Sequence, residues 1–231
     1  MGRYQERERS MSHLLRIGIV DFPAFAGINI NMMPFVIGEK ASLPQSYEQY
    51  WPLIQACHIE KDEEGRIGYL SIMESVVQCG TSQRRPGIHT DGHGSSAWGW
   101  GRGAVSDNGR VRGLYMASNT AQSCRAWNYP VEAPGDAGDC ESLRDILEQS
   151  TATYMDANTI YWMTDKCPHE SLPVMSTAQR QWFRVVTHAV DVWYAYHSTP
   201  NSLGVLPNGK IIYGDKFASS YQRLPAEAGS L

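Results

Sequence analysis

Alternating apolar and polar positions recur along the chain and predict more strands than helices. Runs rich in β-branched and aromatic residues, bounded by turn-forming residues, are typical of strands. Gly80 ends one of these runs, and turn signals separate the others. The predicted strands cover residues 14–22, 67–79, 113–118, 123–128, 158–164 and 180–194.

Two segments have the spacing of helices. In residues 42–57 the large apolar side chains recur at helical intervals, Ser42 is a candidate N-cap, and Pro52 should kink or divide the helix. Residues 142–149 predict a short helix capped by Ser142. No alternating strand–helix rhythm appears. The pattern therefore favours a mainly β fold, and we expect a double-stranded β-helix (a jelly-roll or cupin-like fold) with a few flanking helices.

Length and composition support one globular unit. The 231 residues are 42% hydrophobic and 19% charged, which is ordinary for a folded domain. We expect a single domain over residues 1–231, with a flexible segment at 1–12 and a catalytic β core at approximately 67–195.

Charge and cysteine usage narrow the setting. The net charge of −4 and the absence of a basic block argue against a nucleic-acid partner. No apolar run is long enough for a membrane span, and residues 1–12 lack the apolar core of a signal peptide. The five cysteines form no CxxC pair, so we expect reduced thiols and a cytoplasmic protein.

One short motif carries metal-binding chemistry. His89 and Asp91 are one residue apart in a turn-rich stretch, and on a strand such residues point to the same face. His169, in Cys-Pro-His-Glu, follows the predicted strand 158–164 and can supply a third ligand. Two imidazoles and one carboxylate would form a facial triad that leaves half of the coordination positions of an octahedral metal ion open. The alternative for each residue is a structural role in a turn or at a strand end.

Two arginines share one face of the last long predicted strand. Alternation places Arg180, Trp182, Arg184, Val186 and His188 on the same side. Inward-facing guanidinium groups are costly without anionic partners, and they bind carboxylates through a bidentate fork. A dicarboxylate co-substrate would satisfy one of them.

Together these motifs resemble the Fe(II)/2-oxoglutarate-dependent oxygenases. The order His-Thr-Asp-Gly, then Pro-His-Glu-Ser, then an arginine eleven residues past that histidine is similar to their HxD…H…R pattern. The resemblance covers roughly residues 67–195 at the level of motifs. It implies that His89, Asp91 and His169 hold Fe(II), and that 2-oxoglutarate and O2 are co-substrates. It also implies that Arg180, or instead Arg184, anchors 2-oxoglutarate while a C–H bond is hydroxylated, desaturated or closed into a ring.

Residues near the motif are candidates for substrate contacts. Arg85 can grip a substrate carboxylate or phosphate, as can Arg84. His93, Trp98 and Trp100 follow the motif in a Gly-rich stretch, and the two tryptophans are candidates for a lid. We expect a small-molecule substrate before a protein side chain.

Two other functions remain open. A cupin-type metalloenzyme that ignores 2-oxoglutarate would use His89, His93 and His169 around Zn or Ni, as an isomerase, lyase or dioxygenase, although the first cupin motif is missing. A non-enzymatic jelly-roll module that binds sugars or a protein partner would take up no metal.

Overall fold

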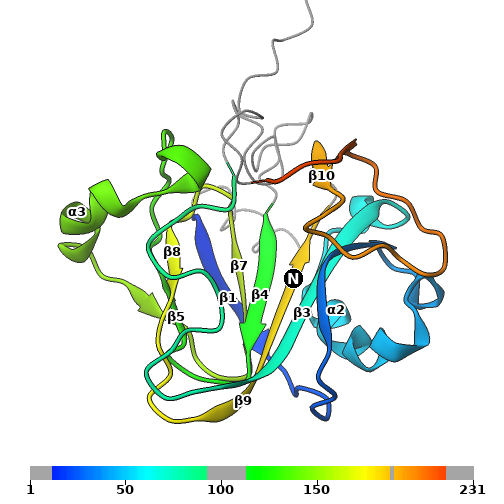
Figure 1. Cartoon of the computed structure of the whole chain (residues 1–231), viewed down its shortest axis with the longest axis horizontal. Coiled ribbons are helices and arrows are strands. Elements are labelled where there is room, and N and C mark those ends of the chain that lie inside the picture. The colour runs from blue at the N-terminus through cyan, green and yellow to red at the C-terminus, as the bar shows by residue number, and fades with distance from the viewer. Residues whose placement is uncertain (1–11, 93–112, 188–189, 217–231) are drawn as a thin grey trace, which may run out of the picture.

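The protein is mainly β, as the sequence predicts, and it is built around one large antiparallel sheet (Figure 1). The computed structural model describes residues 12–92, 113–187 and 190–216, so the expectation of a flexible segment at 1–12 lies almost wholly outside them. The strand order of the large sheet is β1-β7-β4-β9-β3-β2. In chain order its strands are β1 (Leu14–Ile19), β2 (Asn29–Val36), β3 (Ile67–Val77), β4 (Leu114–Ser118), β7 (Thr159–Met163) and β9 (Ala178–Val186).

Two smaller sheets accompany the large one. A three-stranded antiparallel sheet has the order β6-β5-β8, formed by β5 (Cys124–Ala126), β6 (Thr153–Tyr154) and β8 (His169–Ser171). The parallel pair consists of β10 (Val192–Tyr194) and β11 (Lys210–Ile212). The α-helices in the described ranges are α2 (Trp51–Ala56) and α3 (Arg144–Glu148). The 3₁₀ turns are η1 (Lys40–Ser42), η2 (Gln45–Tyr50), η3 (Lys61–Glu63), η4 (Asp136–Gly138) and η5 (Glu141–Leu143).

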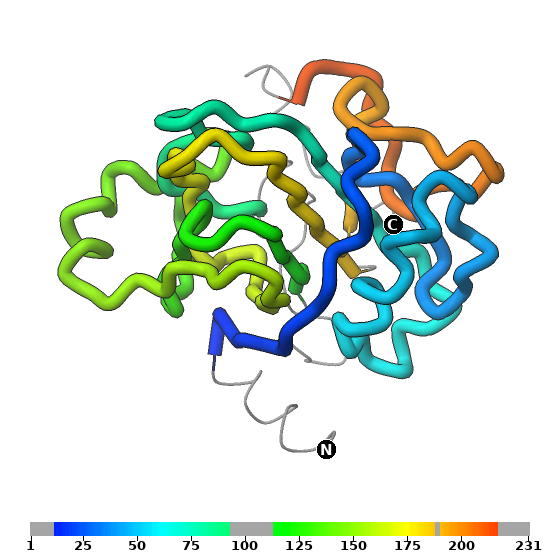
Figure 2. Tube along the Cα trace, turned by 90° about the horizontal axis from the view of Figure 1, so that it is seen from below, coloured from blue at the N-terminus to red at the C-terminus, as the bar shows by residue number. Residues whose placement is uncertain are grey.

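The large sheet buries both of its faces. One face packs against the segment that contains η2 and α2, and the other lies toward the small sheet and α3, on the opposite side of the molecule (Figures 1 and 2). Strand β9 shows the division, since Phe183 and Val185 belong to the first core whereas Trp182 and Val186 belong to the second. The predicted alternation of this strand is therefore confirmed for residues 180–186.

Some predicted elements differ from the structure. The segment 42–57 divides into η2 and α2 at Trp51, with Pro52 in the first turn of α2, so the predicted division is confirmed. Ser42 caps neither helix, because its hydroxyl bonds the main chain of Val36 and Glu39 instead. Ser142 is not a cap either, since it lies within η5 and α3 begins after Leu143.

Two strand predictions also need correction. The predicted strand 180–194 is two strands, because β9 ends at Val186 and β10 starts at Val192. The edge strand β2 was not predicted, since Pro34 interrupts its pattern and a proline is tolerated mainly at a sheet edge. No helix among the described residues combines the length and apolarity needed to cross a bilayer.

The central position of β9 predicts a strong dependence on Phe183, which is 0% exposed and stacks on Tyr50 with ring centroids 6.1 Å apart. Replacing it by alanine removes buried area and leaves a cavity, so we expect Phe183→Ala to lower the free energy of unfolding by about 3–5 kcal/mol. Chemical denaturation measures this change. Val76→Ala is the matched control, because Val76 on the adjacent β3 is 56% exposed and its truncation should change stability by less than about 0.5 kcal/mol.

Candidate metal centre

A reciprocal main-chain pairing brings the two histidines together. The amide of His89 donates to the carbonyl of His169, and the amide of His169 donates to the carbonyl of His89, both at 2.9 Å. His89 also forms an antiparallel bridge with Asp139, so residue 89 lies between β8 and the segment that follows η4. The i, i+2 argument from the sequence assumed a strand for His89 and Asp91. In the structure they lie on a short extended segment outside the regular strands, and this segment pairs on both sides.

Both imidazole rings are oriented by the main chain. The ring centroids lie 4.6 Å apart. Nδ1 of His89 is 2.8 Å from the carbonyl of Gly87, and Nδ1 of His169 is 3.0 Å from the carbonyl of Cys167. A carbonyl only accepts, so each Nδ1 carries the proton and each Nε2 keeps its lone pair for a metal. Burial and the neighbouring His169 lower the pKa of His89 to about 3, which keeps its ring in the neutral, ligating form.

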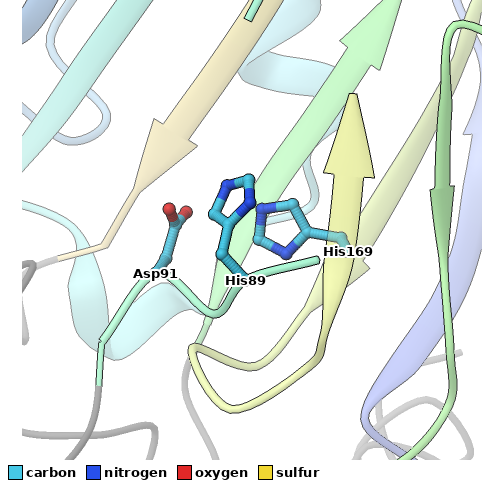
Figure 3. A group of neighbouring side chains, drawn as sticks. All are labelled: His89, Asp91 and His169. Atoms are coloured by element: carbon cyan, nitrogen blue, oxygen red, sulfur yellow. The ribbon is translucent and has the colours of Figure 1, made fainter. Parts of the chain in front are cut away.

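Asp91 completes the group. One ligand atom each from His89, Asp91 and His169 can be chosen so that all lie within 4.8 Å of one another, and these residues can hold a metal ion (Figure 3). Oδ2 of Asp91 accepts a hydrogen bond from Nη1 of Arg184 at 3.0 Å. Burial alone would raise the pKa of Asp91, but Arg184 and the two histidines outweigh it and hold this pKa well below its usual range. Asp91 is therefore a carboxylate, the form that ligates.

A charge network connects the two histidine segments behind the site. Glu141 accepts a hydrogen bond from the amide of Ile88 at 2.6 Å and one from Arg144 at 2.7 Å. Arg144 also binds Glu170 at 3.0 Å, and Arg125 binds the other oxygen of Glu170. Since Ile88 precedes His89 and Glu170 follows His169, this network restrains both histidine-bearing segments, as groups around a metal site usually restrain its ligands.

The pocket lies between the large sheet and the small one. Met116 of β4 lines the pocket from the large sheet. Cys124 of β5 and the histidine and serine of β8 line it from the small sheet. The complete lining is Arg84, Arg85, His89, Asp91, Met116, Cys124, His169, Ser171, Arg180, Trp182 and Arg184. Thus the structure brings the proposed metal ligands and both inward-facing arginines of β9 to a single cavity.

The two arginines of β9 have different partners. Arg184 pairs with Asp91 through Nη1, and its Nη2 is 3.5 Å from Oδ1 of Asn31. Arg180 is 1% exposed, and it donates from Nε to Ser118 and from Nη2 to the carbonyl of Ser123. Among the described residues, Nη1 of Arg180 has no hydrogen-bond partner. Burial lowers the pKa of Arg180 to about 10, which reflects the penalty on its charge.

One pocket residue escaped the sequence interpretation. Ser171 is two residues beyond His169 on β8, and its buried Oγ has no hydrogen-bond partner within the described ranges. The same i, i+2 spacing that linked His89 to Asp91 would have placed Ser171 on the ligand face of β8. The pocket therefore holds three buried polar atoms with unused hydrogen-bonding capacity among the described residues: Nη1 of Arg180, Oγ of Ser171 and Nε of Arg184.

The remaining predicted site residues divide into two groups. Arg85 lines the pocket, and its Nη1 donates to the carbonyl of Ala137 at 2.7 Å. The other predictions, His93, Trp98 and Trp100 as substrate contacts and His188 on the face of β9, lie outside the described residues.

Comparison with known proteins adds no family to this picture: no protein-family model, curated protein or solved structure matches the chain.

The geometry predicts that metal binding depends on Asp91. We expect Asp91→Asn to weaken the binding of a divalent metal ion at least about 100-fold, because the neutral amide is a poor ligand, whereas its oxygen can still accept from Arg184. Anaerobic titration measures the metal affinity, and circular dichroism checks the fold. Asp145→Asn is the matched control, since Asp145 is exposed on α3. Unchanged metal binding in a folded Asp91→Asn protein would reject the ligand set.

Proposed function

We propose that the protein is an Fe(II)- and 2-oxoglutarate-dependent oxygenase built on a double-stranded β-helix. The observation that carries the proposal is the coincidence, in one pocket, of a two-histidine, one-carboxylate group and a deeply buried arginine whose Nη1 is unused. The first feature suits a metal with open coordination positions, and the second suits an anionic co-substrate.

The donor set fits Fe(II). Neutral imidazole nitrogens and a carboxylate oxygen are the ligands of non-haem iron oxygenases, whereas a structural zinc site would be closed by four ligands, often thiolates. Burial raises the pKa of Cys124, which also lines the pocket, to about 12 and keeps it a neutral thiol. His89, Asp91 and His169 would hold the ion, and other positions would remain for the co-substrate and O2.

Arg180 is the better anchor for 2-oxoglutarate. The charge of Arg184 already faces the carboxylate of Asp91, whereas the hydrogen bonds of Arg180 go to a hydroxyl and a carbonyl, both uncharged. A buried cation without an anion is unfavourable, and a carboxylate that bonds Nη1 would relieve this. Oγ of Ser171 would serve the same carboxylate as a second donor.

The arrangement of the sheets supports the jelly-roll assignment. The pocket is enclosed by the large sheet on one side and by β5 and β8 on the other. The extended segment around His89 adds itself to β8, and Asp139 adds to that segment in turn. A small sheet widened in this way and facing a large one is the architecture expected for a double-stranded β-helix.

The residues then have distinct tasks. Iron and 2-oxoglutarate, when bound, supply the activation of O2 for oxidation of a C–H bond. For hydroxylation the balance is that 2-oxoglutarate, O2 and R–H give succinate, CO2 and R–OH. Arg180 orients the co-substrate, the main-chain carbonyls of Gly87 and Cys167 hold the two imidazoles, and Met116 and Trp182 form part of a wall that limits water. A small molecule is the favoured substrate, and a protein side chain is the next.

The first test is spectroscopic. Adding 2-oxoglutarate to the anaerobic Fe(II)-loaded protein should produce a visible charge-transfer band, and admitting O2 should convert 2-oxoglutarate into succinate, which chromatography detects. The Asp91→Asn protein should give neither signal, while Asp145→Asn should give both. A protein that binds Fe(II) tightly yet shows no band and forms no succinate would instead favour the cupin-type alternative.

The second test separates the two arginines. We expect Arg180→Gln to raise the Kd for 2-oxoglutarate at least about tenfold, because a charge-assisted hydrogen bond is lost, with little change in the Kd for Fe(II). Arg180→Lys, which keeps the charge, should have a smaller effect. Arg184→Gln should act mainly on Fe(II) through Asp91. Anaerobic titrations of both ligands measure these values, and the reverse pattern for the two arginines would show that the anchor is wrongly chosen.

A further inference from the structure

Arg84 lies against the same pocket and stacks on an aromatic ring of β9. Its guanidinium carbon is 4.2 Å from the centroid of Trp182, and Arg184 lies near the same ring at 5.2 Å. Stacking on tryptophan holds a guanidinium in a defined plane and leaves its N–H edge available for a ligand. Because Arg84 and Trp182 both line the pocket with His89 and Asp91, Arg84 belongs to the cavity beside the metal ligands.

The charge of Arg84 has no counter-ion of its own. Within the part of the chain that the structure describes, Arg84 makes no hydrogen bond or ion pair, and its guanidinium contacts the ring of Trp182. Burial, Arg184 and Arg180 together lower the pKa of Arg84 to about 10, although Asp91 opposes them. A half-buried cation that is surrounded mainly by other cations is unfavourable until an anion joins it.

This position is distinct from that of Arg180. Arg180 lies four residues before Arg184 on β9, and it donates hydrogen bonds to Ser118 and to the carbonyl of Ser123. Arg84 and Arg184 both lie near the ring of Trp182, and Arg184 is the arginine that pairs with Asp91, so Arg84 lies toward the side of the pocket where Asp91 meets Arg184. A further cation, Lys216, interacts with Asp91, Arg184 and Arg84 and adds to the positive potential there.

We propose that Arg84 binds a carboxylate or phosphate group of the primary substrate, at a second anion site next to the metal ligands and separate from the one at Arg180. Calling this ligand the substrate rests on the proposed function, but the anion site itself does not. The proposal makes the substrate an organic anion, and it assigns to Arg84 a role in specificity.

The test uses methyl phosphate and acetate as probes for the two groups. Each is titrated, at constant ionic strength, into the protein loaded with Mn(II) and saturating 2-oxoglutarate, and ligand-observed NMR of the methyl signal gives the affinity. We expect one probe to bind, Arg84→Gln to weaken its binding at least about tenfold, and Arg84→Lys to retain part of it. Arg16→Gln is the matched control, because the exposed Arg16 lies on the edge strand β1 and should leave binding unchanged.

The preference for methyl phosphate or acetate identifies the group on the substrate. If neither probe binds, or if a folded Arg84→Gln protein binds them as tightly as the wild type, the proposal is overturned. Repeating the titration without metal and 2-oxoglutarate separates the two proposals. Arg84-dependent binding in a protein that takes up neither would reject the oxygenase function and keep the anion site, whereas normal uptake of both without Arg84-dependent binding would do the reverse.

Discussion

The site depends on the two main-chain hydrogen bonds exchanged by His89 and His169. These residues are 80 positions apart in the chain, yet each amide donates to the carbonyl of the other at 2.9 Å. Side chains that are directly opposite in an antiparallel pair lie side by side, which explains the neighbouring imidazole rings. Main-chain carbonyls also accept from both Nδ1 atoms, so the main chain sets both the position and the tautomer of each imidazole.

Strand β9 shows how the fold tolerates a pocket lined by buried guanidinium groups. Its alternate residues Phe183 and Val185 are fully buried in the core on one face, while Arg180 and Arg184 are buried on the other face with the pocket. Buried guanidinium groups weaken a fold unless anions compensate them. Of these two arginines, only Arg184 has a carboxylate partner among the residues that the structure describes. The apolar face of the strand therefore stabilises the sheet and offsets the cost of the buried guanidinium groups on the other face.

Local pattern predicted much of the fold and part of the site. The alternation of β9, the strand β3 and the division of the helix at Pro52 all follow from period and proline chemistry. The cap predicted at Ser42 was wrong because Ser42 bonds the main chain of Val36, a contact that depends on β2, and Pro34 concealed the strand pattern of β2. The extended segment at His89 also escaped pattern, since its pairing partners, His169 and Asp139, are supplied by distant parts of the chain.

The choice between Arg180 and Arg184 marks the limit of that reasoning. The two side chains are identical and share one face, so periodicity gives them equal claims to an anionic ligand. Their difference arises from Asp91, which accepts a hydrogen bond from Nη1 of Arg184 at 3.0 Å. This pairing gives one carboxylate two partners, a guanidinium and a prospective metal, and it partly neutralises the Arg184 end of the strand. Added negative charge is consequently stabilised most at the cations that Asp91 does not reach, and on β9 that cation is Arg180.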